Sequence, residues 1–207
     1  MHTISIIGAG NLGSALARVA AAGGARVQVV ARDIAKARQL AEQVGGEGVQ
    51  FGSPLIGEIV FLAVPYAALS EVISTYGEQL EGMTVVDVTN PVDFDTFDSL
   101  AVASDSSAAR ELQQALPDAS VVKAFNTNFA ATLVSGEVGG VPATVVIAGD
   151  DADAKARVSE VVTAGGIAVA DAGSLKRARE LEALGFLQIV LAVREEVTWA
   201  GGFAVRS

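Results

Sequence analysis

A glycine-rich turn near the N-terminus constrains this chain more than any other feature. Residues Ile4 to Ser14 read ISIIGAGNLGS, an apolar strand that runs into three glycines spaced as G-x-G-x-x-G. Gly8 allows a tight turn, Gly10 lets a ligand approach the backbone, and Gly13 lets a helix pack closely on the strand. A helix that starts here directs unpaired amides and the positive end of its dipole at an anion. We therefore expect the pyrophosphate of a dinucleotide at this turn.

The residues after the turn indicate which dinucleotide binds. A segment with helical periodicity follows the glycines, and a second strand, residues 26–30, comes next at the spacing of a βαβ unit. In NAD sites this strand ends in an acidic residue that binds the ribose 2′-hydroxyl, but here it ends in Ala31 and Arg32. Lys36 follows one helical turn later. Two cations suit a 2′-phosphate, so we predict that NADP(H) binds here.

Asp33 leaves an alternative open, because it directly follows Arg32 and could turn toward a 2′-hydroxyl. An aspartate immediately before a helical segment also serves as an N-cap. We favour the second interpretation, in which Asp33 caps a helix over residues 34–44.

Length and composition exclude several classes of protein. A chain of 207 residues can form one nucleotide-binding domain with a small appendage, but it is too short for a large separate substrate domain. Its longest apolar run, residues 183–193, is shorter than the ~20 residues of a membrane span. No charged segment precedes the first strand as it would in a signal peptide. We therefore expect a soluble cytoplasmic protein with no membrane partner.

Side chains that bind metals or nucleic acid are scarce. The chain has no cysteine and one histidine, His2, so we expect no metal site of thiolates or imidazoles. A net charge of −10 argues against nucleic acid as a partner. Residues 1–50 nevertheless carry five basic and three acidic side chains. The positive part of the chain is thus the part predicted to bind phosphates.

Strand and helix patterns alternate along the chain, which predicts an α/β fold of the Rossmann type, a doubly wound and mostly parallel sheet with a short helical C-terminal lobe. Residues 1–149 are expected to form the NADP-binding Rossmann domain. Residues 150–207 are expected to form a βα extension that completes an acceptor pocket and contributes to a dimer. Beyond the first βαβ unit, the strands are predicted at residues 58–64, 83–88, 120–124, 144–148 and 167–170.

Prolines stop two of these strands at the edge where ligands bind. Val64-Pro65-Tyr66 and Thr89-Asn90-Pro91 each follow a predicted strand, and the residue before a proline is pushed out of helical geometry. Ligands of open α/β sheets lie at the carboxyl ends of the strands. We therefore expect Val64, Pro65, Tyr66 and Asn90 to line the cofactor site, although either proline alone could simply end a strand.

The longest irregular segment is residues 90–107, and loops of this length often cover a binding site. It contains four aspartates, at positions 93, 95, 98 and 105. They lack the glycine and the closing glutamate of a calcium-binding loop, so a solvated acidic loop is the simpler interpretation.

A cluster of cations lies near the C-terminus. Ser174 is a predicted N-cap for a helix that runs to Trp199, and Lys176, Arg177 and Arg179 fall in its first turns, where the helix dipole disfavours cations. Either ion pairs with Glu180 and Glu182 or a bound anionic ligand would compensate. The helix also has more apolar residues than one buried stripe requires, so we expect a homodimer.

The chain offers few proton donors for a reductase. His2 precedes the first strand, at the sheet end remote from the cleft, and Tyr66 and Lys123 lie at strand ends where such residues more often pack or pair. Reduction of a ketone or imine by NADPH usually needs a positioned acid. Hydride exchange between two redox cofactors needs less, because ring nitrogens exchange protons with water. The sequence therefore favours a cofactor-to-cofactor reductase.

Several motifs together resemble the coenzyme F420-dependent NADP oxidoreductases over essentially the whole chain. The motifs are IIGAGNLGS at 6–14, Ala31-Arg32 with Lys36, VKAFNT at 122–127, AGDD at 148–151, and DAGSL at 171–175 with Arg179. The resemblance implies hydride transfer between NADP(H) and an 8-hydroxy-5-deazaflavin. It implies NADP contacts for Asn11, Leu12, Arg32 and Lys36, contacts near the nicotinamide ribose for Pro65 and Tyr66, and a deazaflavin contact for Arg179.

One departure from that family concerns the acceptor. Asn126 stands where the archaeal members have a histidine, and KAFNT is closer to the cytosolic domain of the metalloreductases that feed a membrane haem. We therefore expect Asn126, Phe129, Ser174 and Arg179 to bind the acceptor, with coenzyme F420 the first candidate. The alternatives are an NADPH-dependent reductase of a flavin, ferric or small carbonyl or imine acceptor, and a noncatalytic NADP(H) sensor.

Overall fold

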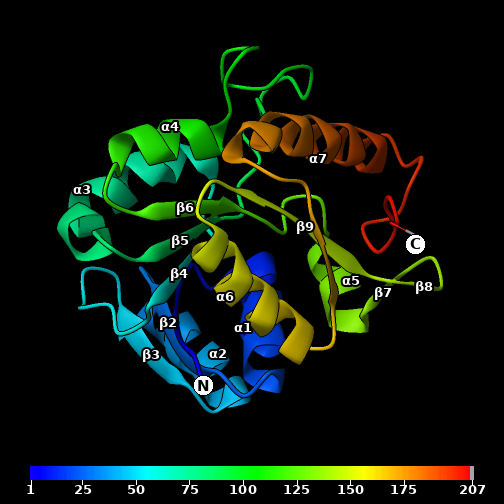
Figure 1. Cartoon of the computed structure of the whole chain (residues 1–207). Helices are drawn as coiled ribbons and strands as arrows, with labels where there is room; N and C mark the ends of the chain where they lie inside the picture. Colours follow the sequence, from blue (N-terminus) through cyan, green and yellow to red (C-terminus); the bar gives the residue numbers. More distant parts are fainter. Residues whose placement is uncertain (206–207) are drawn as a thin grey trace.

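The computed structural model describes residues 1–205 and contains an eight-stranded sheet (Figure 1). The strand order is β10-β9-β6-β5-β4-β1-β2-β3. The strands are β1 (Thr3–Ile7), β2 (Arg26–Ala31), β3 (Glu47–Gln50), β4 (Ile59–Leu62), β5 (Thr84–Asp87), β6 (Ser120–Lys123), β9 (Thr144–Gly149) and β10 (Ala168–Asp171). All neighbours from β3 to β6 are parallel, which confirms the predicted mostly parallel α/β sheet.

Helices cover both faces of the sheet. Figure 1 shows α3, α4 and α7 on one side and α1, α2 and α6 on the other, and each side has its own apolar core. The helices are α1 (Asn11–Ala22), α2 (Ile34–Val44), α3 (Leu69–Leu80), α4 (Ala108–Ala115), α5 (Ala130–Ser135), α6 (Ala152–Ala164) and α7 (Ala178–Val193), with 3₁₀ turns η1 (Tyr66–Ala68) and η2 (Leu175–Arg177). The sequence analysis did not predict β3 or the small hairpin of β7 (Glu137–Val138) and β8 (Val141–Pro142).

Local sequence explains why these elements form. All four residues of β4, Ile-Val-Phe-Leu, are buried, as expected for a strand covered on both faces. The predicted N-cap of α2 is confirmed, since the Asp33 carboxylate accepts hydrogen bonds from the amides of Ala35 and Lys36. Asp33 is thereby turned toward its own helix rather than toward a ribose.

The direction of the strands places the binding crevice. Chain order reverses at β1, which lies between β2 and β4, and ligands of doubly wound sheets bind at the carboxyl ends of the strands on either side of such a point. β9 runs antiparallel to β6, and β10 runs parallel to β9. β10 therefore points away from the crevice, and the turn after it, residues 172–177, makes hydrogen bonds with Ile147, Gly149 and Asp150 at the end of β9.

The C-terminal region differs from the prediction in the length of its helix. The predicted division at residue 149 falls between β9 and β10, which pair in one sheet, and the division itself stays a prediction. The helix predicted to run from Ser174 to Trp199 consists of η2 and α7 and ends at Val193. A turn with Glu195 in the left-handed region (φ 63°) reverses the chain there. Residues 206–207 lie outside the described part.

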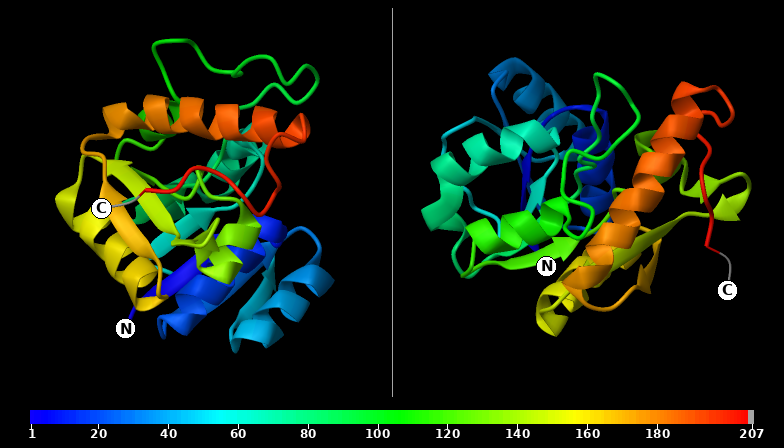
Figure 2. Two further views of the ribbon diagram at one scale, coloured as in Figure 1. Left: turned by 90° about the vertical axis from the view of Figure 1, so that its right-hand side faces the viewer. Right: turned by 90° about the horizontal axis from the view of Figure 1, so that it is seen from above.

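The predicted loop over residues 90–107 contains no helix or extended strand, only an isolated bridge between Val92 and Leu100. It projects from the body of the protein near α7 (Figures 1 and 2). Ser107 ends it by capping α4, accepting a hydrogen bond from the amide of Arg110 at 3.1 Å. No helix within residues 1–205 is long and apolar enough to cross a membrane.

Candidate active site

The three glycines of the β1–α1 turn have distinct surroundings. Gly8 has φ +124°, and a Cβ there would lie 2.0 Å from the carbonyl oxygen of Ala63 on the chain that leaves β4. A Cβ on Gly13 would lie 2.1 Å from the Gly8 oxygen, so both positions require glycine for packing. A Cβ on Gly10 would meet nothing within 4 Å. The open side of Gly10, at the start of α1, fits a pyrophosphate that contacts backbone amides.

A cavity of about 500 Å³ extends from this turn along the carboxyl ends of β1, β2 and β4. We call it the cofactor cavity. Its lining includes six of the predicted cofactor residues, Gly8, Gly10, Arg32, Lys36, Val64 and Pro65. Arg32 and Lys36 are largely exposed, and the Arg32 guanidinium pairs with the carboxylate of Glu71, which lines the same cavity from α3. The two residues predicted to bind a 2′-phosphate, Arg32 and Lys36, thus line the same cavity.

A second cavity of about 530 Å³ is lined in part by the first residues of α1. We call it the acceptor cavity. Asn11 and Leu12, the first residues of α1, line it together with Asn90, Asn126 and Phe129, all of them predicted site residues. Phe94 from the acidic loop and Trp199 from the segment after α7 add aromatic side chains to the wall. The ring centroids of Trp199 and Phe129 lie 4.9 Å apart. Neither Phe94 nor Trp199 was predicted, because no sequence motif marks them.

Two asparagines join the strand ends to α7. The Asn90 side-chain amide donates to the Asn126 carbonyl oxygen at 2.8 Å, and the Asn126 amide donates to Asn90 Oδ1 at 2.9 Å and to the Leu181 carbonyl at 2.8 Å. These partners use both amide hydrogens of Asn126. Its Oδ1 atom and that of Asn128 are buried, and neither accepts a hydrogen bond from residues 1–205. Buried acceptors of this kind favour a ligand that carries N–H or O–H donors.

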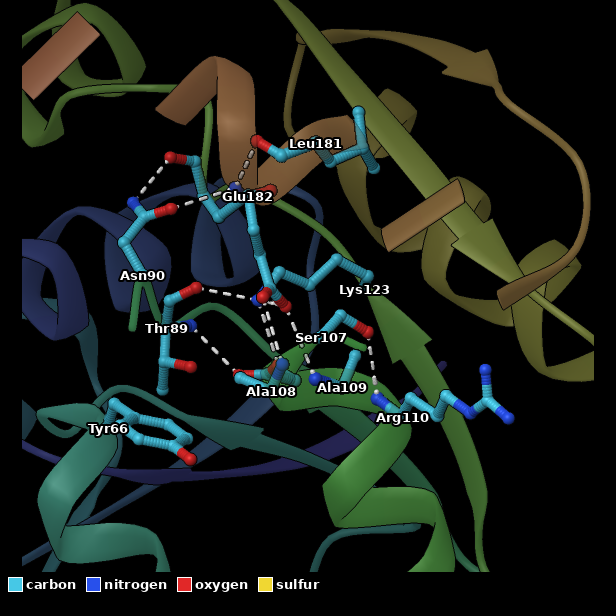
Figure 3. A network of polar contacts seen from close by, with 12 residues as sticks. Tyr66, Thr89, Asn90, Ser107, Ala108, Ala109, Arg110, Lys123, Leu181 and Glu182 are labelled. Carbon is cyan, nitrogen blue, oxygen red and sulfur yellow. Dashed lines mark hydrogen bonds and ion pairs between the residues drawn. The ribbon is translucent and has the colours of Figure 1, made fainter. Parts of the chain in front are cut away.

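A buried ion network lies close to these asparagines (Figure 3). Lys123 Nζ lies 2.9 Å from Asp87 Oδ2, 2.8 Å from Glu182 Oε1 and 2.6 Å from the Thr89 carbonyl, and all three charged side chains are at most 1% exposed. Glu182 also accepts hydrogen bonds from the amides of Ala108 and Ala109 at the start of α4. The network links the ends of β5 and β6 to the start of α4 and to α7.

Comparison with known proteins agrees with this geometry. Residues 3–91 match the family model described as "NADP oxidoreductase coenzyme F420-dependent". The F420-dependent NADP reductase of Methanothermobacter marburgensis is 29% identical, with 94% of this chain and 93% of that protein covered. The chain is thus similar to this family.

A solved structure extends the similarity to the whole length of the chain. A protein from Arthrobacter sp. FB24, described as a candidate F420-dependent NADP reductase, superposes with a TM-score of 0.87 over 100% of both chains at 26% identity. Metalloreductase STEAP3 of Rattus norvegicus is 33% identical over 87% of this chain. The chain spans only 36% of the length of that relative. The similarity to metalloreductase STEAP3 thus concerns one part of a longer protein.

Tyr66 does not line the cofactor cavity. Its hydroxyl donates to Glu111 on α4 at 2.6 Å, and it lines a groove between α3 and α4 (Figure 3 shows the ring). Burial, followed by the bond to Glu111, raises the pKa of Tyr66 to about 12. Tyr66 is therefore a poor proton donor, and its predicted cofactor contact would have to come from its backbone or from η1.

Ser174 and Arg179 are not among the residues that line the acceptor cavity. The turn that holds Ser174 follows β10 and lies beside the end of β9, where Gly173 accepts a hydrogen bond from the Gly149 amide at 3.1 Å. Arg179 pairs with its neighbour Glu180 at 2.9 Å, and the predicted pairing with Glu180 at helical spacing is confirmed by Arg177 at 3.7 Å. The other is wrong, because Glu182 turns inward to Lys123. Arg179 lines neither the cofactor cavity nor the acceptor cavity, and its deazaflavin contact stays a prediction.

Gly185 makes the close approach of α7 to the acceptor cavity possible. A Cβ there would lie 2.4 Å from Asn90 Oδ1 and 2.8 Å from the Asn126 oxygen. We expect Gly185→Ala to lower the free energy of unfolding by about 1–3 kcal/mol through overpacking. Gly77→Ala on α3 is the matched control, since its Cβ would meet only Leu116 at 3.9 Å, and it should stabilise by about 0.4–1 kcal/mol. Urea unfolding measures both changes, and equal stability of Gly185→Ala and the unmodified protein would contradict the packing.

Proposed function

We propose that the protein transfers hydride between NADP(H) in the cofactor cavity and a deazaflavin of the coenzyme F420 type in the acceptor cavity. The observation that carries the proposal is that consecutive residues at the start of α1 line the two cavities. Gly10 lines the first cavity, and the next two residues, Asn11 and Leu12, line the second. A dinucleotide whose pyrophosphate lies at Gly10 would have its nicotinamide end directed toward the second cavity.

The residues of the cofactor cavity fit NADP(H). The amides at the start of α1 would bind the pyrophosphate, and Arg32 and Lys36 would bind the 2′-phosphate by charge-assisted hydrogen bonds. Bound NADPH supplies a hydride from its nicotinamide ring. The chain's part is then to hold two rings in contact and to exclude water between them.

The lining of the acceptor cavity supports a redox cofactor as the acceptor. Within residues 1–205, every side chain that lines this cavity is apolar, aromatic or an asparagine amide. The two candidate acids nearby are already engaged, Tyr66 by Glu111 and Lys123 by two carboxylates and a carbonyl. A deazaflavin or flavin needs no positioned acid, because its ring nitrogens exchange protons with water. A ketone or imine acceptor usually needs one.

The relatives bear on the choice between acceptors. The names of the archaeal relatives support coenzyme F420, and the name of the rat relative keeps a ferric acceptor as the second candidate. The aromatic walls and the buried, unpaired amide oxygens favour a flat organic ring over a hydrated ferric chelate.

An absorbance assay of NADPH oxidation tests the proposal. The acceptors are coenzyme F420, FMN, FAD, ferric citrate and a set of small carbonyl and imine compounds, each at equal concentration. We expect the fastest oxidation with the deazaflavin and much slower oxidation with the carbonyls. If NADPH binds but no acceptor is reduced, the protein is a noncatalytic NADP(H) sensor and the proposed function is wrong.

We also propose that the protein forms a homodimer through α7. Leu187 is 48% exposed and Val193 is 44% exposed on this helix, although Leu181, Ile189 and Ala192 are buried in the protein itself. Light scattering at micromolar concentration should give twice the chain mass of 21.0 kDa. A mass near that of one chain would show that the exposed part of α7 is not an interface.

A further inference from the structure

A carboxylate from α3 lies beside the cations that are proposed to bind the 2′-phosphate. Glu71, in the first turn of α3, lines the cofactor cavity together with Arg32 and Lys36. Its carboxylate pairs with the Arg32 guanidinium, and both side chains are accessible, Arg32 at 67% and Glu71 at 47% exposure. An ion pair between side chains this exposed contributes little to stability, so another anion can replace either partner. Arg32 therefore has an exchangeable anionic partner within the cavity itself.

This ion pair joins the two sides of the cofactor cavity. β1 lies between β2 and β4 in the sheet, Arg32 follows β2, and Glu71 belongs to the helix that follows β4. The other cation, Lys36, lies 4.0 Å from Asp33, whose carboxylate accepts hydrogen bonds from two amides of its own helix. These bonds fix Asp33 at its cap. The pair of Arg32 with Glu71 is therefore the contact that a phosphate at Arg32 would exchange.

From these observations we infer that Glu71 sets the preference of the cofactor cavity between NADP(H) and NAD(H) by competing with the 2′-phosphate for Arg32. A phosphate that binds the guanidinium displaces the Glu71 carboxylate and then stays close to it, because both anions lie within reach of one side chain. NAD(H) carries a hydroxyl at this position and requires no such exchange. Glu71 therefore weakens the binding of NADP(H) selectively, and the preference is smaller than Arg32 and Lys36 alone would give.

The competition also bears on release of the cofactor. The inference rests on the proposed position of the 2′-phosphate at Arg32, and it is independent of which acceptor is reduced. Affinity differences between closely related complexes occur mostly in the dissociation rate. Return of the Arg32 guanidinium to Glu71 therefore favours dissociation of NADP(H), a step that limits turnover in many enzymes.

Glu71→Gln tests the inference, because it removes the charge and keeps the size of the side chain. We expect the variant to bind NADPH and its fragment 2′,5′-ADP about 3- to 10-fold more tightly than the unmodified protein does at low salt. NADH and AMP, which lack the 2′-phosphate, should change in affinity by less than about 2-fold. At about 0.5 M salt the gain for NADPH should fall below about 2-fold, because the interacting charges are exposed and screened. Isothermal titration measures the four affinities, and stopped-flow fluorescence should show slower dissociation of NADPH from the variant.

Glu78→Gln is the matched control. Glu78 is exposed on the same helix and does not line the cofactor cavity, so its substitution should leave all four affinities within about 2-fold. Urea unfolding should give nearly the same midpoint for both variants and for the unmodified protein, because exposed ion pairs contribute little to stability.

The outcomes separate this inference from the proposed function. Unchanged or weaker binding of NADPH and 2′,5′-ADP by Glu71→Gln would overturn the inference. An equal gain for NADH and AMP would also overturn it, because the ion pair would then merely obstruct the cavity. Either result would leave the proposed hydride transfer in place. If neither the unmodified protein nor Glu71→Gln binds 2′,5′-ADP more tightly than AMP, the 2′-phosphate does not lie at Arg32, and the proposed cofactor contacts are wrong together with the inference.

Discussion

Arg32→Ala should weaken NADP(H) binding about 10- to 100-fold, because charge-assisted hydrogen bonds to a phosphate contribute roughly 1.5–3 kcal/mol. NADH binding should hardly change, since NADH lacks the phosphate that Arg32 would bind. Isothermal titration with both dinucleotides measures the two effects. Arg38→Ala is the matched control, because Arg38 is an exposed arginine on α2 that does not line the cofactor cavity.

The unmodified protein provides the first test of the predicted preference for NADP(H). It should bind NADPH much more tightly than NADH. Equal affinity for the two would show that Arg32 and Lys36 do not bind a 2′-phosphate. An equal loss of both affinities in Arg32→Ala would instead indicate that the ion pair of Arg32 with Glu71 has a structural role in the cavity wall.

Lys123→Met should destabilise the protein by roughly 3–5 kcal/mol, the largest stability change we expect from one substitution. Methionine is close to lysine in volume, but it leaves Asp87 and Glu182 buried without a cation. Lys176→Met is the matched control at an exposed site and should change stability by less than about 0.5 kcal/mol. Urea unfolding at neutral pH compares the two variants.

The loss of unfolding free energy caused by Lys123→Met should become smaller as the pH falls. Burial raises the pKa of the Glu182 carboxyl, and Lys123 opposes that rise. A carboxyl with a raised folded-state pKa adds stability that is fully present below its unfolded pKa and is lost as the pH rises through the folded pKa. Without Lys123 the folded pKa rises further. The stability gap between the variant and the unmodified protein should therefore narrow as the pH falls from about 8 to about 5. A gap independent of pH would contradict an ionised Glu182 in the network.

Local patterns explain why the dinucleotide site could be predicted. The roles of Gly8, Gly10 and Gly13 depend on short-range geometry, and the structure shows a packed, an open and a packed position in that order. The cap at Asp33 depends on two neighbouring amides only. The lining residues Val64 and Pro65 follow from a strand end and a proline. Each of these features is contained in a few consecutive residues.

Tertiary relations explain why other parts could not be predicted. The direction of β9 is not encoded in its own residues, and its reversal moved Ser174 away from the crevice. Glu182 has the spacing of a surface ion-pair partner, but its burial depends on Lys123, 59 positions earlier in the chain. Phe94 and Trp199 line one cavity although they lie 105 positions apart in the chain, so no local pattern could bring them together.

Transfer of a labelled hydride tests the central proposal most directly. NADPH with deuterium at the transferred position of the nicotinamide ring is mixed with the protein and coenzyme F420 in ordinary water. Transfer between two rings in adjoining cavities predicts that the deuterium appears on a carbon of the reduced deazaflavin ring, where it does not exchange with solvent. Reduced deazaflavin without deuterium, or no reduction at all with NADPH bound, would contradict direct hydride transfer between the two cavities.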